Sequence, residues 1–409
     1  MRVLVVSQYF PPEPGATQNR LGSFVDGLVE RGADVTVVCE QPNHPAGVFH
    51  PGFGRRPVMT ERNGHRVVRR LWVATAPRKS TGRRLAFYGT FAAGAGGLVA
   101  AAARHDVVFV STPPLPGALA AAAAARARRT PLVVDVRDIW PAAAQALGEL
   151  SQPRLVRAFE RAERWMYRSA HTVTTTTSTF CRHIEYVAGR PISVHLPNGA
   201  LDELLALPER PMPNGGPFTV GYAGNLGLAQ GLGIVLDAAE RLRDEEVRFV
   251  LVGDGPRGDD LREQAGERGL ENVEIRPGVP VSEVGGVLQS SHALLVPLRD
   301  HEVLGGFIPS KLYDAMAVGR PAIVAARGEA AALVAEHDAG VAIPPEDGEA
   351  LADAIRELKG NPERAATLGA SGHRAAPRYA RSHQVEQLAT ILEQAASSQP
   401  KRIGQSATP

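Results

Sequence analysis

The chain has 409 residues, of which 44% are hydrophobic and 22% are charged, and its formal net charge is +2 at pH 7. This length exceeds what one hydrophobic core usually supports, so we expect two globular domains. The small net charge excludes a strongly basic or acidic protein whose overall field would select its partners. The two cysteines, Cys39 and Cys181, exclude a disulfide framework and a cysteine metal cluster, and they favour a reducing compartment.

Two apolar stretches could have been targeting or membrane segments, and neither fits that role. The amino-terminal "MRVLVVSQYF" is only strand-length and has no extended basic region before it, unlike a signal peptide. The uncharged run at 87–103 consists mostly of Ala and Gly, and it is shorter than the ~20 apolar residues that span a bilayer. We therefore expect a buried or interfacial helix at 87–103.

The first 198 residues alternate between short apolar runs and longer stretches with helical spacing. The apolar runs are nearly continuous, which is typical of parallel strands covered on both faces. We expect strands at 2–8, 34–40, 66–73, 106–112, 131–138, 172–177 and 193–198, and helices at 18–31, 84–104, 116–128 and 155–170.

The second half repeats this alternation, so we predict an α/β fold of two Rossmann-like, doubly wound parallel sheets. A segment rich in Pro and Gly at 198–217 breaks the periodicity and marks the linker. We expect strands at 218–224, 247–253, 273–278, 293–298, 321–326 and 339–344, and helices at 231–243, 258–268, 281–289, 310–317, 330–336 and 348–359. The predicted division is an amino-terminal domain at 1–198, a carboxyl-terminal domain at 199–377, a separate helix at 378–396 and a disordered polar tail at 397–409.

Ligands of open α/β sheets bind beyond the carboxyl ends of the strands, so residues at those ends are the site candidates. After the first strand comes "FPPEPGATQNRL", where Gly15 allows close backbone approach and a helix start could receive an anion or a sugar oxygen. An ordinary strand-to-helix turn is the alternative. The spacing and the lysine of a Walker loop or a dinucleotide fingerprint are missing.

The strand at 131–138 ends in the charged sequence "DVRD". Asp135, Arg137 and Asp138 close a buried strand, where charges cost free energy unless they are paired or functional. Either an Asp–Arg pair holds the loop, or an acid and a cation face a ligand and stabilise charge on a leaving group.

Glycines follow the first two strands of the second half. Gly224 and Gly227 lie in "GYAGNLG", and Gly253 and Gly255 flank Asp254 in "LVGDGP". Backbone amides exposed by such glycines can bind an anion, although glycine-rich turns are also common without a ligand.

A further candidate is the helix start in "GGFIPSKLYDAMAVGRPAIV". Pro309 and Ser310 would begin the helix, so that free backbone amides and Lys311 could hold a diphosphate. Asp314 lies four residues after Ser310 and on the same side, where its carboxylate could accept hydrogen bonds from a ribose diol. A structural helix start is the alternative.

The stretch at 55–84 holds ten Lys or Arg residues and one acid, Glu61. A solvated basic face is one interpretation. Contact with an anionic membrane through 55–103 is the other, because the cations precede an apolar helix. Nucleic acid is not expected, because no recognisable binding motif accompanies the charge.

The motifs "PSKLYDAMAVGRPAIV", "GYAGNLG", "LVGDGP", "ENVEIRPGV" and "VHLPNGAL" together resemble the second domain of family 4 retaining glycosyltransferases of GT-B fold. The motifs "VLVVSQYFPPEPGATQNRL" and "DVRDIWP" resemble the branch that builds bacterial surface polysaccharides of the fucosamine, colanic-acid and O-antigen types. The resemblance covers residues 1 to about 395, and these motifs are specific only in combination.

This resemblance implies a cytoplasmic enzyme, with the inner face of the membrane as an alternative location. It would move a sugar, with retention, from a nucleotide-diphosphate sugar to a lipid-linked or saccharide acceptor, with a UDP-sugar as the favoured donor. It also implies two domains facing a cleft, with the donor on the second domain and the acceptor mainly on the first. The helix at 378–396 would cross back to the first domain. No metal and no cofactor are expected, because helix starts and cations would balance the diphosphate charge.

Residue roles carry over by position in the motifs. Asp314 takes the place of the second Glu of the family's E-x7-E motif, whereas Gly306 replaces the first. Asn225 and Gln230 replace a phosphate-binding Arg and Lys, so Lys311 would compensate. The predicted nucleotide-sugar site comprises Gly15, Gly224, Asn225, Gly227, Gln230, Gly253, Asp254, Gly255, Arg276, Pro277, Gly278, Val279, Ser310, Lys311, Leu312 and Asp314.

The catalytic candidates are Arg137, Asp138, Lys311 and Glu13. Arg137 replaces the family's usual His, and Lys311 would stabilise the departing diphosphate. Asp138 and Glu13 are the candidate bases if one is needed, because the leaving phosphate could itself take the acceptor proton. Two other functions stay open: a UDP-sugar 2-epimerase of related fold, and a non-catalytic nucleotide-sugar-binding module at a membrane.

Overall fold

The computed structural model describes residues 1–13, 15–43, 47–75, 81–146 and 152–398. These residues form two compact units. Unit 1 comprises Met1–Trp140, Gln152–Leu196 and the chain from Val385 onward, and unit 2 comprises Pro141–Ser151 and Pro197–Gln384. The predicted disordered tail lies largely outside the described residues.

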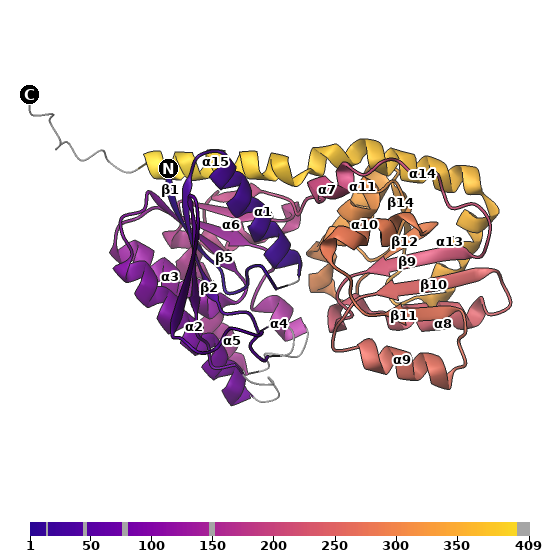
Figure 1. Ribbon diagram of the computed structural model, residues 1–409, viewed down its shortest axis with the longest axis horizontal. Coiled ribbons are helices and arrows are strands. Elements are labelled where there is room, and N and C mark those ends of the chain that lie inside the picture. The colour runs from indigo at the N-terminus through magenta and orange to yellow at the C-terminus, as the bar shows by residue number, and fades with distance from the viewer. Residues whose placement is uncertain (14, 44–46, 76–80, 147–151, 399–409) are drawn as a thin grey trace, which may run out of the picture. The chain divides into compact units, whose positions relative to one another are not determined.

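Unit 1 is built on an eight-stranded sheet of order β3-β4-β2-β1-β5-β6-β7-β8, in which only β3 is antiparallel to its neighbour (Figure 1). Strand residues alternate between two covered faces, which is why the apolar runs are nearly continuous. The strands are β1 (Arg2–Val6), β2 (Asp34–Glu40), β3 (Val58–Asn63), β4 (Arg66–Leu71), β5 (Val107–Thr112), β6 (Leu132–Val136), β7 (Thr172–Thr175) and β8 (Ser193–His195). The helices are α1 (Ala16–Glu30), α2 (Thr81–Ala101), α3 (Leu115–Ala127), α5 (Pro153–Ser169) and α6 (Ser178–Ala188).

Unit 2 is built on a six-stranded, all-parallel sheet of order β11-β10-β9-β12-β13-β14. Two hydrophobic clusters cover its faces: Leu295 belongs to one, and its neighbours Leu294 and Val296 belong to the other. The strands are β9 (Phe218–Ala223), β10 (Val247–Val252), β11 (Val273–Arg276), β12 (Ala293–Pro297), β13 (Ala322–Ala325) and β14 (Gly340–Ile343). The helices are α4 (Ala142–Ala146), α7 (Asp202–Leu205), η1 (Leu228–Gln230), α8 (Gly233–Arg241), α9 (Gly258–Glu267), α10 (Val281–Gln289), η2 (Glu302–Gly306), α11 (Ser310–Ala317), α12 (Glu329–Glu336), α13 (Gly348–Gly360), α14 (Pro362–Ala375) and η3 (Ala376–Tyr379).

The last helix, α15 (Arg381–Ser397), returns the chain to unit 1. Figure 1 shows α15 in yellow. From Val385 onward its apolar side chains join the cluster that contains Phe24 and Leu28 of α1. Gly27 of α1 is placed against Val385, where a Cβ would lie 2.6 Å from a Val385 methyl group. The predicted fold class, two parallel-sheet α/β domains with a returning helix, is therefore confirmed.

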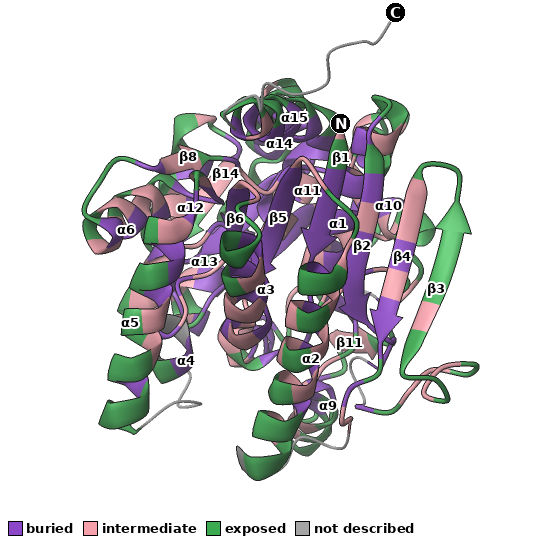
Figure 2. Ribbon diagram, turned by 90° about the vertical axis from the view of Figure 1, so that its left-hand side faces the viewer, coloured by how far each residue is buried: buried purple, intermediate pink, exposed green. Residues whose placement is uncertain are grey.

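Several elements differ from the sequence prediction. Strand β3 was not expected, because it is an exposed edge strand with no apolar run; Figure 2 shows it mostly green beside β4. The prediction also missed α6 and α14, although each has a capping residue: the Thr177 hydroxyl and the Asn361 side chain accept a backbone N–H. The segment at 198–217, expected as a plain linker, contains α7, and the last helix begins at Arg381 rather than at 378.

The run at 87–103 forms most of α2, which packs on α3 and on the sheet of unit 1. Within the described part of the chain, no helix is both long enough and apolar enough to cross a membrane.

Candidate functional site

In unit 2 the loops after β9, β10 and β11 pack directly on one another. The Leu226 amide donates to the Asp254 carbonyl, and the Gly278 amide donates to the Asp254 carboxylate at 3.2 Å. A Cβ on Gly255 would collide with the Leu226 backbone and with the Asn225 side chain, so the loops need glycine here. The predicted loop residues of Gly224–Gly227, Gly253–Gly255 and Gly278 are thus brought together at the carboxyl ends of three strands.

The helix start after β12 brings Lys311 to the β9 loop. The Lys311 amino group lies 5.0 Å from the centre of the Tyr222 ring, and a Cβ on Gly224 would lie 2.7 Å from that amino group. Gly224 has a positive φ of 137°, so both the backbone and the lysine require glycine. Burial lowers the pKa of Lys311, while Asp314 acts in the opposite direction.

Asp314 is a half-buried carboxylate without a full set of partners among the described residues. Lys311 and Asp314 line one small cavity of about 20 Å³ with Tyr222, Val284 and Leu288, which is room for about one hydroxyl-sized group. The Asp314 Oδ1 atom is buried and has no hydrogen-bond partner among the described residues. Burial raises the pKa of Asp314 to about 6, although the charges of Arg381 and Lys311 lower it. Ser310 begins α11, as expected, and Leu312 is buried in the core.

Other predicted residues of unit 2 lie near this edge but make local contacts. Gln230 ends η1, and its Oε1 atom and the Asn225 amide would both lie within 2.6 Å of a Cβ on Gly227. Arg276 is exposed and forms an ion pair with Glu274 at 2.6 Å. Pro277 and Val279 follow β11 in the same loop as Gly278. Gly306, where the family motif has its first Glu, ends η2, and Glu302 at the start of η2 is exposed.

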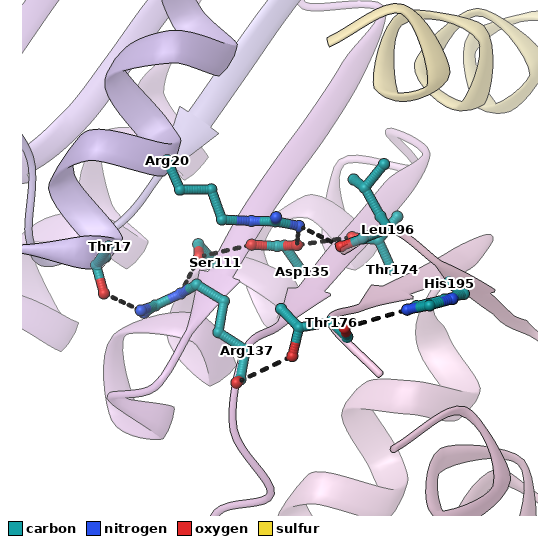
Figure 3. Close-up of polar contacts among 9 residues, drawn as sticks. All are labelled: Thr17, Arg20, Ser111, Asp135, Arg137, Thr174, Thr176, His195 and Leu196. Atoms are coloured by element: carbon teal, nitrogen blue, oxygen red, sulfur yellow. Dashed lines mark hydrogen bonds and ion pairs between the residues drawn. The ribbon is translucent and has the colours of Figure 1, made fainter. Parts of the chain in front are cut away.

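In unit 1 a buried polar network joins α1 to the carboxyl ends of β5, β6 and β7 (Figure 3). Asp135 accepts hydrogen bonds from Arg20 at 3.0 Å, Thr174 at 2.9 Å and Ser111 at 3.2 Å. Asp135 and Arg20 are 0% and 3% exposed, so the pair is removed from water, and protein groups satisfy the Asp135 carboxylate. These contacts therefore support a structural role for Asp135 rather than contact with a ligand.

Arg137 is held at the edge of that network. Its guanidinium donates to Ser111 at 2.9 Å and also to the Thr17 hydroxyl (Figure 3). It donates to the Pro113 carbonyl as well. Burial lowers the pKa of Arg137 to about 10, which leaves it charged at neutral pH, and Asp135 favours that charge. Arg137 is thus a fixed cation at a strand end, next to the start of α1 where Gly15 lies.

The two candidate bases differ in surroundings. Glu13 is 3% exposed, and its carboxylate accepts the Asn43 amide at 2.7 Å, so it holds the loop after β2. Asp138 is half-buried beside Arg137, and its charge acts on Arg137 and on Tyr167 of α5. Within the residues that the structure describes, no group of three or more His, Cys, Asp or Glu residues could hold a metal ion.

Sequence reasoning missed the residues that contact Asp135, Arg137 and Lys311. These are Thr17, Arg20, Ser111, Thr174 and Tyr222. A signal existed for Ser111 and Thr174, because each is a hydroxyl residue inside an otherwise buried strand, where a polar group needs a partner. Nothing in the sequence pairs Arg20 with a carboxylate 115 residues away.

Comparison with known families gives two matches that lie side by side along the chain. Residues 15–199 match the description "Glycosyl transferase 4-like domain", and residues 217–361 match "Glycosyl transferases group 1".

Two curated relatives show the extent of similarity at the sequence level. The putative colanic acid biosynthesis glycosyl transferase WcaI of Escherichia coli (strain K12) is 27% identical over 387 residues, covering 87% of this chain and 92% of that protein. The O-antigen chain mannosyltransferase C of Escherichia coli is 29% identical over 154 residues, covering 37% of this chain and 40% of the relative.

Solved structures share the fold. The lipopolysaccharide glycosyltransferase WaaG aligns with a TM-score of 0.68 at 16% identity, covering 95% of this chain and 99% of WaaG. HepE of Anabaena, in complex with UDP-glucose, aligns with a TM-score of 0.64 at 17% identity, covering 96% of this chain and all of HepE. At these identities the likeness concerns the fold alone.

Proposed function

Because the chain belongs to the group 1 glycosyltransferases with a family 4-like amino-terminal domain, we propose that it transfers a sugar from a nucleotide-diphosphate sugar, with retention and without a metal ion. UDP is the favoured nucleotide, and the acceptor is lipid-linked or a saccharide in bacterial surface-polysaccharide synthesis. The observation that carries the proposal is the half-buried carboxylate of Asp314, whose buried Oδ1 atom lacks a partner among the described residues, one turn after a helix start that carries Lys311.

A diphosphate suits the start of α11. The Leu312 amide donates to the Pro309 carbonyl at 3.0 Å. The Ser310 and Lys311 amides precede the hydrogen-bonded turns of the helix, and the Pro309 cap position supplies no side-chain acceptor, so these two amides can receive anionic oxygens. The Lys311 amino group is held between Tyr222 and Gly224, which places a cation at the same helix start. These donors bind more tightly as negative charge develops on the departing diphosphate, which is the requirement for catalysis rather than binding alone.

A ribose suits Asp314. A buried carboxylate oxygen without a partner carries a desolvation cost that a ligand hydroxyl group can offset. Lys311 and Arg381 favour the ionised form that accepts such a hydrogen bond. With Gly306 in place of the first motif Glu, backbone groups rather than that carboxylate face the donor sugar.

Unit 1 contributes a fixed cation. Arg137 is held by Ser111 and Thr17 and stays charged, so it can orient an acceptor or stabilise charge on the leaving group. Asp138 is the base candidate that remains, since the Glu13 carboxylate already binds the Asn43 amide. Transfer with the leaving phosphate as proton acceptor requires neither.

The relatives support the donor and the pathway class. WcaI is named for colanic acid biosynthesis, and HepE is described in complex with UDP and with UDP-glucose. A cytoplasmic location at the inner face of the membrane follows from the same proposal, since a lipid-linked acceptor would be presented there.

Peripheral membrane contact through 55–103 is part of the proposal. The exposed side chains Leu85 and Trp72 (72% and 43% exposed) lie within that basic stretch. Clustered cations with exposed apolar side chains bind anionic bilayers in a salt-dependent way. Co-sedimentation with anionic vesicles at low and high salt tests this membrane contact. Binding that is unchanged at about 1 M salt would contradict an electrostatic contact.

The decisive experiment compares Asp314→Asn with Glu302→Gln, an exposed acid of the neighbouring η2. Calorimetric titration with UDP should show a loss of roughly tenfold or more in affinity for Asp314→Asn and no change for Glu302→Gln. Equal affinity in all three proteins would overturn the nucleotide site.

Turnover separates the alternatives. Incubation with UDP-sugars and lipid-linked acceptors should give a glycosylated acceptor and UDP. Release of UDP with a glycal and without an acceptor would indicate the epimerase. Tight UDP binding with no turnover of any donor would indicate the binding module.

A further inference from the structure

A second cavity lies in unit 1, at the opposite end of the sheet from Arg137. It is lined by the amino-terminal parts of β1 and β2, by β4 and by the end of α2, and its volume is about 210 Å³. Arg2 and Asp34 are register partners at the start of β1 and β2, so the cavity opens near the amino ends of the strands. Ligands of the proposed transferase bind at the carboxyl ends, so this cavity belongs to neither candidate site.

The floor of the cavity is one face of the sheet. Leu4 and Thr36 are register partners, as are Val38 and Arg69, and all four line the cavity. Leu98 of α2 and Ala102, directly after this helix, form the opposite wall. Most of the wall is therefore apolar, and one arginine enters it from β4.

Arg69 is the unusual member. Its Nε–H is buried and has no hydrogen-bond partner among the described residues, and no ion pair is found for its guanidinium. Arg70, the next residue, is fully used: it forms two hydrogen bonds to Glu61, at 2.6 and 3.2 Å, and one to the Pro11 carbonyl. A buried guanidinium donor without a partner costs free energy that an anion would offset.

The charges around the cavity favour an anion. Arg2, Arg69 and Arg104 line it with a single acid, Asp34, so the lining carries a net charge of +2 when His105 is neutral. The Asp34 carboxylate is already bound to His65 at 2.6 Å. Arg2 reaches Asp106 only at 3.5 Å, and its side chain is 51% exposed. Arg69 therefore has no acid of its own in this cavity.

From this geometry we infer a second binding site in unit 1, for a phosphate group carried on a short apolar chain, with Arg69 as the phosphate ligand and Leu4, Val38 and Leu98 around the chain. The cavity is smaller than the ~300 Å³ typical of drug-sized sites, so the part that enters must be small. The headgroup of an anionic lipid and a free phosphate ester share this chemistry. The site does not depend on the proposed transferase activity.

The test uses the full chain and three probes: inorganic phosphate, hexyl phosphate, and phosphatidylcholine vesicles with and without phosphatidic acid. Hexyl phosphate should bind with higher affinity than inorganic phosphate, because only the ester uses the apolar wall. Arg69→Gln should weaken hexyl phosphate binding about tenfold, as measured by calorimetry. Arg31→Gln, an exposed arginine directly after α1 that lies outside the cavity and outside the basic stretch at 55–84, is the matched control and should bind like the wild type.

A second variant covers the case in which Arg69→Gln fails to fold. Ala102→Phe fills the cavity from the end of α2, so it should abolish binding of the ester without lowering the melting temperature. Vesicle binding that requires both phosphatidic acid and Arg69 identifies a lipid headgroup. If hexyl phosphate binds but vesicle association is the same in the wild type and in Arg69→Gln, the ligand is a free phosphate ester. Absence of saturable ester binding, or equal binding by Arg69→Gln and Arg31→Gln, overturns the site.

Discussion

Asp135 in unit 1 and Asp314 in unit 2 are both carboxylates shielded from water, yet their surroundings differ. Asp135 accepts three hydrogen bonds, from Arg20, Ser111 and Thr174. Asp314 has a buried oxygen without a partner, and Lys311 and Arg381 act on it only through their charge. This difference indicates two roles for such acids. An acid whose oxygens all have hydrogen-bond partners stabilises the fold, whereas an acid with an unpartnered oxygen is available to a ligand.

The largest effect on stability is expected from removing the cation that pairs with Asp135. Arg20→Met should lower the free energy of unfolding by about 3–5 kcal/mol, because it leaves Asp135 charged and buried without its cation. Chemical denaturation measures this loss. Arg31→Met, an exposed arginine at the end of the same helix, is the control and should stay within about 0.5 kcal/mol of the wild type. A similar loss in both variants would show that the ion pair is not the cause.

An intermediate effect is expected at Glu163 of α5, which is 3% exposed and accepts one hydrogen bond, from Tyr167 at 2.7 Å. Burial raises the pKa of Glu163 to about 7, while the Tyr167 hydroxyl opposes this shift and Glu160 adds to it. Because the folded protein holds this proton more tightly than the unfolded chain, the free energy of unfolding should fall as pH rises from about 4.5 to 7. Glu163→Gln keeps the acceptor for Tyr167 and should be more stable than the wild type by about 2 kcal/mol at pH 8.

Melting curves of both proteins between pH 4 and 8 measure the Glu163 effect. Glu30→Gln, at the exposed end of α1, serves as the control. A stability difference between Glu163→Gln and the wild type that is independent of pH would contradict the titration of this carboxylate.

The smallest stability effect is expected at Asp314. Its pKa is also raised, to about 6, so its ionisation costs folding free energy as pH rises from about 4 to 6. The side chain is only partly buried, so Asp314→Asn should stabilise the free protein by about 1 kcal/mol at pH 8. The same variant loses nucleotide affinity, and wild-type affinity should fall as pH drops below about 6, because a protonated acid is a poorer acceptor. If Asp314→Asn is less stable than the wild type and binds UDP equally well, then Asp314 has a structural role like that of Asp135.

Much of the fold was predictable because it is encoded locally. Continuous apolar runs predicted the buried parallel strands, and spacing predicted most helices to within a few residues. Strand β3 was not predicted because an exposed edge strand shows no hydrophobic pattern. Helices α6 and α14 were not predicted because they are short and mix polar with apolar residues, even though Thr177 and Asn361 cap them.

The candidate site was predictable to a lesser degree. Ser310, Lys311 and Asp314 lie within five residues on one helix, so their common placement follows from helical geometry. The glycine loops were expected at strand ends, but not their mutual packing, in which the Asp254 carboxylate binds the Gly278 amide. The partners of Arg137 and the cavity around Arg69 had no counterpart in the prediction.

The sequence by itself determined the alternation of strands and helices, the family, and the helix start at Ser310. Each of these depends on residues that are neighbours along the chain. Only the tertiary structure decided that Asp135 is satisfied by Arg20, that Lys311 passes over Gly224, and that the Arg69 Nε–H has no hydrogen-bond partner within the described part of the chain. Whether a buried charge is satisfied depends on groups that the sheet order brings together from far along the chain, and short-range patterns do not encode that order.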